Sequence, residues 1–206
     1  MFGILVVDIQ GDFTTWKKGS LAVPNTDENY VKEIERTILR FQKENKGFLI
    51  ASQDWHPSDY ISFASNHLGK KLYDRIEING KTQILWPDHC IQETEGSKLL
   101  IDENIFNNII KKGQDPNSPE SYSAVKDSNG VETGLVDILH TNNINQIAIC
   151  GVATEYCVKE TAIDLIKSGF QVFILKDLCR GISPYICYLA FDEMKQKGIE
   201  IWTRKN

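Results

Sequence analysis

The sequence predicts an α/β protein with three layers, in which helices cover both faces of a mainly parallel, doubly wound sheet of about six strands. Short apolar runs recur along the chain without the alternation of a half-exposed strand, which indicates strands buried on both faces. Segments with apolar residues at helical spacing lie between these runs. The length of 206 residues fits a single domain, residues 1–206, that is large enough to bury a substantial core.

The strands are predicted from the apolar runs. The strong runs cover residues 2–7, 47–51, 147–150 and 170–175, and the weaker ones cover 105–110 and 199–202. In open α/β sheets, binding and chemistry gather at the carboxyl ends of the strands. Asp8, Asp54 and Gly151 stand at such ends, so this edge of the sheet is where a functional site is expected.

Four helices are predicted between the strands. They cover residues 29–44, 131–140, 154–168 and 184–197. Gly169 and Gly198 follow the last two, as expected for helix ends. Pro184 after Ser183 marks the start of the fourth, because proline is favoured in the first turn.

One long polar segment interrupts this alternation. The stretch from His56 to Gly96 contains Pro57, Pro87 and several glycines. Loops this long in a compact domain are usually functional or disordered. Two histidines that could bind a metal lie in it, so we predict a metal-binding loop insertion at about 54–96.

Composition excludes several classes of protein. The net charge is −5 and the basic residues are scattered, so no basic field favours nucleic acid. Residues 1–10 do not have the features of a signal peptide, and no apolar run approaches a membrane span, so a cytoplasmic location without membrane contact is expected. The odd count of five cysteines argues against a disulfide scaffold.

A carboxylate and an imidazole lie two residues apart just past a predicted strand. In extended backbone, alternate side chains point the same way, so Asp54 and His56 can reach one ion. A third ligand must come from elsewhere, and His89 is the best candidate. Two imidazoles and one carboxylate suit a borderline divalent ion and leave positions open for water or substrate.

Other residues compete for the place of the third ligand. His67 is not excluded by its spacing from the pair. His140 falls at the end of a predicted helix, where a cation is favoured, so it is interpreted as structural. Cys90 could coordinate zinc, but a thiolate would make a more closed site.

Cys157 is the candidate nucleophile. It lies where a predicted strand passes into a helix, and a thiol in the first helical turn is exposed to free N–H groups that stabilise thiolate. The same groups could form an oxyanion hole. Thr154 is predicted to cap this helix. The alternative is that Cys157, like Cys150, is only a small buried hydrophobic residue.

A thiol that attacks an amide needs a base, and later an acid for the departing amine. Asp8, at the end of the first strand, can do this work if burial raises its pKa. Lys112 follows the strand predicted at 105–110, where it can lower the thiol pKa and pair with Asp8. Taken singly, Asp8 could be a hydrogen-bonded carboxylate and Lys112 a surface lysine.

A set of short motifs extends along the chain in a fixed order. They are Val7-Asp8-Ile9-Gln10 with Asp12-Phe13, then residues 19–24, 54–57, 61–64, 85–90, Lys112-Gly113, 121–124 and 151–158. Together they resemble the nicotinamidase branch of the isochorismatase-like cysteine hydrolases. The resemblance covers nearly the whole chain, and the ordered set of motifs makes it specific.

The resemblance implies roles for particular residues. The implied catalytic triad is Asp8, Lys112 and Cys157, and the implied metal ligands are Asp54, His56 and His89 rather than His67. The implied walls of a ring-binding slot are Phe13, Trp86 and Tyr122. The implied oxyanion hole consists of the N–H groups of Ala153 and Cys157, with a cis peptide between Val152 and Ala153.

The resemblance also implies an activity. It is the hydrolysis of nicotinamide to nicotinate and ammonia, as in NAD salvage, through a cysteine thioester and with one divalent metal ion. Zinc is expected, while iron and manganese accept the same ligands. The expected partner is the small-molecule substrate, and a homo-oligomer is left open. The alternatives are action on another small amide or an enol ether, and a non-catalytic binding relative. A dinucleotide-binding oxidoreductase is disfavoured, because no G-x-G-x-x-G follows the first strand.

Three positions depart from the pattern of the family. Val125 stands where many relatives carry phenylalanine, and Cys179-Arg180-Gly181 replaces a more usual Thr-Arg-Pro. Both are expected to change packing only. Asp88 stands beside His89, where a small residue or proline is common, and is expected to add negative charge near the metal.

Overall fold

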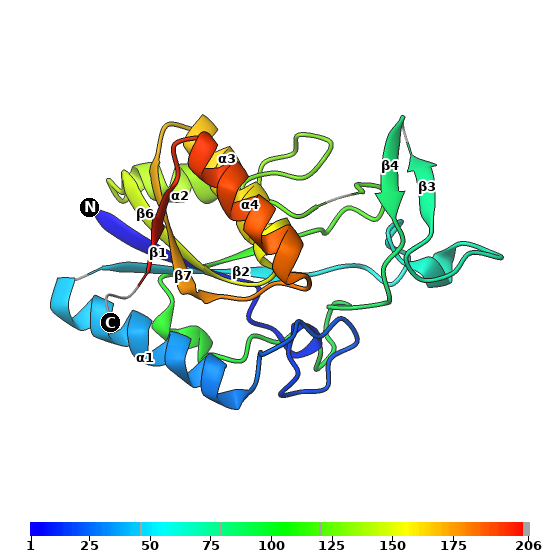
Figure 1. Ribbon diagram of the computed structural model, residues 1–206, viewed down its shortest axis with the longest axis horizontal. Coiled ribbons are helices and arrows are strands. Elements are labelled where there is room, and N and C mark those ends of the chain that lie inside the picture. The colour runs from blue at the N-terminus through cyan, green and yellow to red at the C-terminus, as the bar shows by residue number, and fades with distance from the viewer. Residues whose placement is uncertain (46, 79, 120, 204–206) are drawn as a thin grey trace.

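The computed structural model describes residues 1–45, 47–78, 80–119 and 121–203, which form a central sheet covered by helices (Figure 1). Six strands pair in the order β5-β2-β1-β6-β7-β8, and every pair is parallel. Their bounds are Phe2–Val7 for β1, Phe48–Asp54 for β2, Asn108–Lys112 for β5, Gln146–Gly151 for β6, Gln171–Cys179 for β7 and Glu200–Trp202 for β8. The predicted six-stranded parallel sheet is confirmed.

Four α-helices cover the two faces of the sheet. They are α1 (Glu28–Asn45), α2 (Leu135–Thr141), α3 (Lys159–Lys167) and α4 (Pro184–Gln196). Figure 1 shows α1 on one face and α2, α3 and α4 on the other. The predicted three-layer architecture is therefore confirmed, with the apolar strands buried between helices.

The register of the strands decides what meets at their carboxyl ends. In the pairing of β1 with β6, Val7 lies opposite Gly151, and in the pairing of β2 with β5, Asp54 lies opposite Lys112. The strand order also reverses between β1 and β6, which is the position where open α/β sheets form a binding crevice. The sheet therefore brings the ends of β1, β2, β5 and β6 to one place.

Two of the predicted helices begin differently from the expectation. The helix predicted at 131–140 begins only at Leu135, because Gly134 before it has a left-handed backbone (φ 88°). Val131 lies in a turn in which its N–H donates to Asp127. The helix predicted at 154–168 opens with a π-helical turn, Thr154–Val158, and α3 follows it.

The polar insertion contains a hairpin that the sequence analysis missed. Strands β3 (Arg75–Ile78) and β4 (Lys81–Ile84) pair antiparallel as a separate two-stranded sheet. Figure 1 shows this hairpin set apart from the main sheet, on the side toward which the parallel strands run. It therefore stands at the same end of the molecule as the strand termini. Within the described ranges, no helix has the length and hydrophobicity to cross a membrane.

Candidate active site

The three residues predicted to carry the chemistry meet at the strand ends. Asp8 directly follows β1, Lys112 ends β5, and Cys157 lies in the π-helical turn after β6. Lys112 Nζ lies 3.0 Å from Asp8 Oδ2 and 3.5 Å from Cys157 Sγ. All three side chains are buried. Ser52 Oγ donates a hydrogen bond of 2.7 Å to the other oxygen of Asp8 and so fixes the orientation of this carboxyl.

The pKa values of the two carboxyls beside Lys112, those of Asp8 and Asp54, shift in opposite directions. Burial raises the pKa of Asp8 above its ordinary value, and this outweighs the effect of Lys112. Burial also disfavours the charged form of Asp54, but Lys112 and His56 outweigh it and the pKa of Asp54 falls well below its ordinary value. Since Asp54 keeps its charge, Asp8 is the carboxyl of the two that is suited to carry a proton.

The thiol of Cys157 departs from one expectation. Burial raises its pKa well above the ordinary value, and although Lys112 lowers it as predicted, Asp8 and Asp54 raise it further. The expectation of a thiolate stabilised by the helix start did not include the burial of Cys157 or the two carboxyls beside it, both of which favour the protonated thiol. A protonated thiol needs a base at the moment of attack, and Asp8 is in contact with it.

The turn that carries Cys157 is wider than an α-helical one. The carbonyl of Ala153 accepts the N–H groups of Tyr156 at 3.1 Å and Val158 at 3.2 Å. Such π turns occur frequently at functional sites. The peptide between Val152 and Ala153 is cis, as the family resemblance implies. The prediction that Thr154 caps the helix was wrong: the helix α3 begins after Val158 without a side-chain cap.

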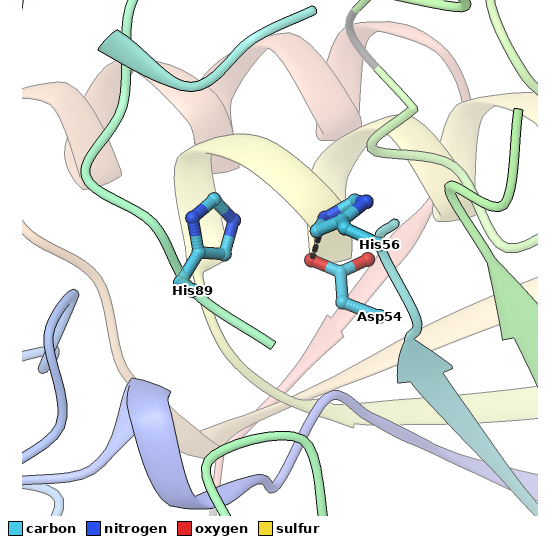
Figure 2. Close-up of side chains that lie close together, drawn as sticks. All are labelled: Asp54, His56 and His89. Atoms are coloured by element: carbon cyan, nitrogen blue, oxygen red, sulfur yellow. Dashed lines mark ion pairs between the residues drawn. The ribbon is translucent and has the colours of Figure 1, made fainter. Parts of the chain in front are cut away.

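Asp54, His56 and His89 form a second cluster beside the thiol (Figure 2). One potential ligand atom from each lies within 4.8 Å of the others, and His56 Nε2 is 3.4 Å from Asp54 Oδ2. Figure 2 shows His89 facing the Asp54–His56 pair from a separate segment of chain. The structure thus brings together the three predicted metal ligands.

Hydrogen bonds to backbone carbonyls orient both imidazoles of this cluster and leave Nε2 of each ring for a metal ion. His56 Nδ1 lies 2.8 Å from the carbonyl of Gly113, and His89 Nδ1 lies 2.7 Å from the carbonyl of Pro87. Because a carbonyl only accepts, Nδ1 carries the proton in each ring and Nε2 is left to coordinate. Burial, together with His56, lowers the pKa of His89 to about 4, which keeps this ring neutral at physiological pH. The donor set fits a divalent ion.

The competing ligands lie elsewhere. Nε2 of His67 is 2.7 Å from the carbonyl of Ile61, His140 is exposed near the end of α2, and the Cys90 thiol lies 3.8 Å from the Gly96 carbonyl. In the part of the chain that the structure describes, the cluster of metal-ligating atoms around Asp54 includes none of them.

Asp88 precedes the predicted ligand His89 but has its own hydrogen-bond partner. Its carboxyl is exposed and accepts a hydrogen bond of 2.5 Å from Ser65 Oγ. It is not one of the residues that line the cavity. Its side chain is bonded to Ser65 outside the cavity lining, so the expectation that Asp88 adds negative charge near the metal stays a prediction.

A cavity with aromatic walls opens above Cys157. It encloses about 530 Å³, including its opening to solvent, and is lined by the predicted slot residues Phe13, Trp86 and Tyr122 together with the three metal-site residues. Trp86 Nε1 donates a hydrogen bond of 3.3 Å to Tyr122 Oη, which ties two of these walls together. A flat aromatic ring matches such a lining.

Several residues of the site were missed from the sequence. The ring of Tyr60 stacks on His56 at 4.2 Å, while Tyr156 and Ile182 line the cavity. Gln10 is fully buried: its Nε2 donates to the carbonyl of Asp54 at 2.8 Å, and its Oε1 accepts the N–H of Asp54 at 2.8 Å. Gln10 thus holds both backbone groups of a metal-site residue. Its place two residues after Asp8 was a usable signal.

Gly113 has a left-handed backbone (φ 67°), and a Cβ on it would lie 2.2 Å from Cε1 of His56. We expect Gly113→Ala to displace the His56 ring and to lower the metal content of the purified protein at least about tenfold. Gly130→Ala is the matched control, because Gly130 has a similar φ of 85° with nothing within 4 Å of its Cβ position. Equal metal content in the two variants would contradict the role assigned to this contact.

Comparison with known proteins agrees with this geometry. The model of the isochorismatase domain family matches residues 3–206. A nicotinamidase of Escherichia coli is 36% identical over 205 residues, which cover 97% of this chain and 93% of the relative. The yeast nicotinamidase with the inhibitor nicotinaldehyde superposes with a TM-score of 0.90 at 31% identity, covering 99% of this chain and 100% of that one. The zinc complex of a pyrazinamidase from Pyrococcus horikoshii superposes with a TM-score of 0.80 at 36% identity, covering 98% of this chain and 99% of that one. The chain therefore belongs to the isochorismatase domain family, in the branch that contains these nicotinamidases and pyrazinamidases.

Proposed function

We propose that this protein hydrolyses nicotinamide to nicotinate and ammonia, as in NAD salvage, through a thioester on Cys157. The observation that carries the proposal is the contact of Cys157 with Asp8 and Lys112 at a cavity with aromatic walls, directly beside the Asp54 cluster. The full-length similarity to nicotinamidases supports it.

We infer that the metal is a divalent ion, zinc in the first place, held by Asp54, His56 and His89. A zinc complex of a related pyrazinamidase supports this choice, as does a ligand set of two imidazoles and one carboxylate. When bound, the ion supplies a Lewis-acidic centre for the pyridine nitrogen. We further propose that residues 1–206 form one domain in which the insertion at about 54–96 delivers both histidines.

The acylation step follows from the neighbours of the thiol. Phe13 and Trp86 hold the two faces of the ring, which presents the carboxamide carbon to Cys157. Asp8 accepts the thiol proton as sulfur attacks the carbonyl carbon. The resulting oxyanion is placed toward the N–H groups of Ala153 and Cys157, each contributing about 3–4 kcal/mol of transition-state stabilisation.

Asp8 then returns a proton to the nitrogen. The carbon–nitrogen bond breaks, ammonia leaves, and the acyl group remains on Cys157 as a thioester. A water molecule attacks this thioester and gives one proton to Asp8, which passes it to sulfur as the carbon–sulfur bond breaks and so restores the Cys157 thiol. The carboxylic acid loses its remaining proton to solvent and leaves as nicotinate. Lys112 balances the negative charge on Asp8 and sulfur throughout, which accounts for its burial between them.

His89→Ala removes one of the three ligands from the metal site. We expect the variant to lose metal affinity by about 10–100-fold or more, and to bind nicotinamide correspondingly less tightly. Metal content after dialysis against a weak chelator is the measurement. His67→Ala is the control, because His67 lies in the same insertion but contacts the carbonyl of Ile61 instead. Metal retained equally in both variants would remove His89 from the ligand set.

The activity itself is tested by ammonia release from nicotinamide, with metal content measured on the same sample. Release by metal-loaded protein supports the proposal. A metal-loaded protein that releases no ammonia would reject nicotinamide as the substrate and direct the search to other small amides. Tight binding of nicotinamide without release would instead favour a non-catalytic relative.

A further inference from the structure

One buried carboxylate near the nucleophile takes no part in the proton transfers or the metal site. Glu155 lies in the π-helical turn two residues before Cys157, and only 5% of it is exposed. Its Oε1 accepts the N–H groups of Ile182 and Ser183, both at 2.9 Å. Its Oε2 lies 3.5 Å from Cys187 Sγ. A buried carboxylate costs stability unless it is bonded in this way, so these contacts define where it must lie.

The segment that Glu155 holds, residues 180–183, is here called the wall loop. The wall loop is bound to the start of the π-helical turn by backbone hydrogen bonds as well. The N–H of Thr154 donates to the carbonyl of Arg180 at 2.8 Å, and the N–H of Arg180 donates to the carbonyl of Gly151 at 3.1 Å. Glu155 therefore extends an existing junction further along the wall loop.

The junction is closely packed. A Cβ built on Gly181 would lie 2.3 Å from Glu155 Oε2 and 2.1 Å from Cys187 Sγ. The backbone of the wall loop at Gly181 is thus in direct contact with the Glu155 carboxylate and the Cys187 thiol. A side chain at this position would push the wall loop away from the π-helical turn.

The wall loop also reaches the cavity. Ile182 lines it, together with Cys157 and Ala153. The N–H of the same Ile182 is bonded to Glu155. One carboxylate thus links a residue of the cavity wall to the turn that carries the nucleophile.

We propose that Glu155 is a positioning residue, which fixes the distance between the wall residue Ile182 and the Cys157 thiol and so aligns a bound amide with the nucleophile. This proposal rests on the proposed hydrolysis for its substrate. Its physical basis is that small displacements in an active site cost a large part of the rate.

The test compares Glu155→Ala with Glu155→Gln. The alanine variant loses the acceptor for both N–H groups, and we expect KM for nicotinamide to rise about tenfold and kcat to fall about a hundredfold. We also expect slower alkylation of Cys157 by iodoacetamide at fixed pH, followed by peptide mass spectrometry. Glutamine keeps an acceptor oxygen in the same place, so it should restore kcat and KM to within about threefold. Metal content should equal that of the wild type in both variants.

Ser183→Ala is the matched control. It removes the hydroxyl that accepts the N–H of Ile186 at the start of α4, but it leaves the bond from the Ser183 backbone to Glu155. We expect a lower melting temperature with wild-type kcat, KM and alkylation rate. If Glu155→Ala behaves in the same way as Ser183→Ala, Glu155 is merely structural and the proposal is overturned.

A second variant keeps the proposal testable if Glu155→Ala does not fold. Gly181→Ala pushes the wall loop from the carboxylate and should reproduce the rise in KM and the slower alkylation. Wild-type kinetics in Gly181→Ala would overturn the proposal, as would a Glu155→Gln variant as impaired as Glu155→Ala. A wild-type protein that releases no ammonia from nicotinamide defeats the proposed function only, since the alkylation rates still decide the role of Glu155.

Discussion

Replacing Cys157 with alanine is expected to lower ammonia release from nicotinamide by on the order of 10⁴-fold or more, because among the described residues that line the cavity Cys157 alone carries a thiol. The thiol is buried beside Asp8 and Lys112, so its loss removes the attacking atom and leaves the cavity walls in place. Steady-state assays should show the loss, while metal content and nicotinamide binding stay close to those of the wild type.

Cys150→Ala is the control for this variant. Cys150 is also a buried thiol, but it lies within β6 and belongs to the hydrophobic core. Its replacement should lower stability slightly and leave turnover within a few-fold. Turnover by Cys157→Ala at a level similar to that of Cys150→Ala would end the assignment of Cys157 as nucleophile.

Lys112→Met is expected to destabilise the metal-free protein by about 3–5 kcal/mol, besides abolishing turnover. Lys112 is buried and forms ion pairs with both Asp8 and Asp54. Methionine fills a similar volume but leaves two carboxyls in a buried site without a cation. The measurement is the free energy of unfolding from urea titrations at pH 7.5.

The loss of stability in Lys112→Met should depend on pH. In the wild type, the pKa of Asp54 is lowered by folding. Its contribution to the free energy of unfolding is therefore present above the ordinary pKa of an aspartate and is lost as the pH falls through the pKa of Asp54 in the folded protein. Without Lys112, burial raises the pKa of both carboxyls, so they are protonated at higher pH. The difference in unfolding free energy between variant and wild type should therefore shrink as the pH is lowered from 7.5 to 5.

Lys111→Met provides the comparison for the neighbouring lysine. Lys111 is exposed and its Nζ lies 3.6 Å from the centre of the Trp55 ring. Its removal should cost no more than about 1 kcal/mol at either pH. A cost for Lys112→Met that is equally small, or that does not change with pH, would contradict the account of the buried ion pairs.

Much of the fold could be predicted because buried strands and helices have characteristic patterns of apolar residues in the sequence. The inner strands β1, β2 and β6 are covered on both faces and appear as apolar runs, and Gly169 and Gly198 lie just past the ends of α3 and α4. The edge strand β5, Asn108–Lys112, is less apolar, and it begins three residues later than the predicted run 105–110. The hairpin β3–β4 was missed although Arg75-Ile76-Glu77-Ile78 alternates and Asn79-Gly80 follows it, a dipeptide that favours tight turns. The length and polarity of the insertion concealed this local signal.

The residues of the site could be predicted from the sequence, but the pKa of the Cys157 thiol and the backbone of its turn could not. Residues at the ends of parallel strands meet by topology, so Asp8 and Lys112 could be placed beside Cys157 in advance. The raised pKa of the Cys157 thiol could not be predicted, because it depends on burial and on two carboxyls brought from other strands. The π-helical turn was also beyond prediction, since the sequence from Thr154 onward has ordinary helical spacing.

The pairing of β1 with β6 has a consequence for the way the protein matures. Residues 2–7 lie beside residues 146–151, so the contact that unites Asp8 with the turn carrying Cys157 joins segments from distant parts of the chain. Contacts of high sequence separation form slowly, because a large loop must close first. A nascent chain that has emerged only as far as α2 already carries Asp8, Lys112 and the three metal-site residues, but it has no nucleophile. Enzymatic competence should therefore appear late in synthesis, when β6 and the turn after it join the sheet.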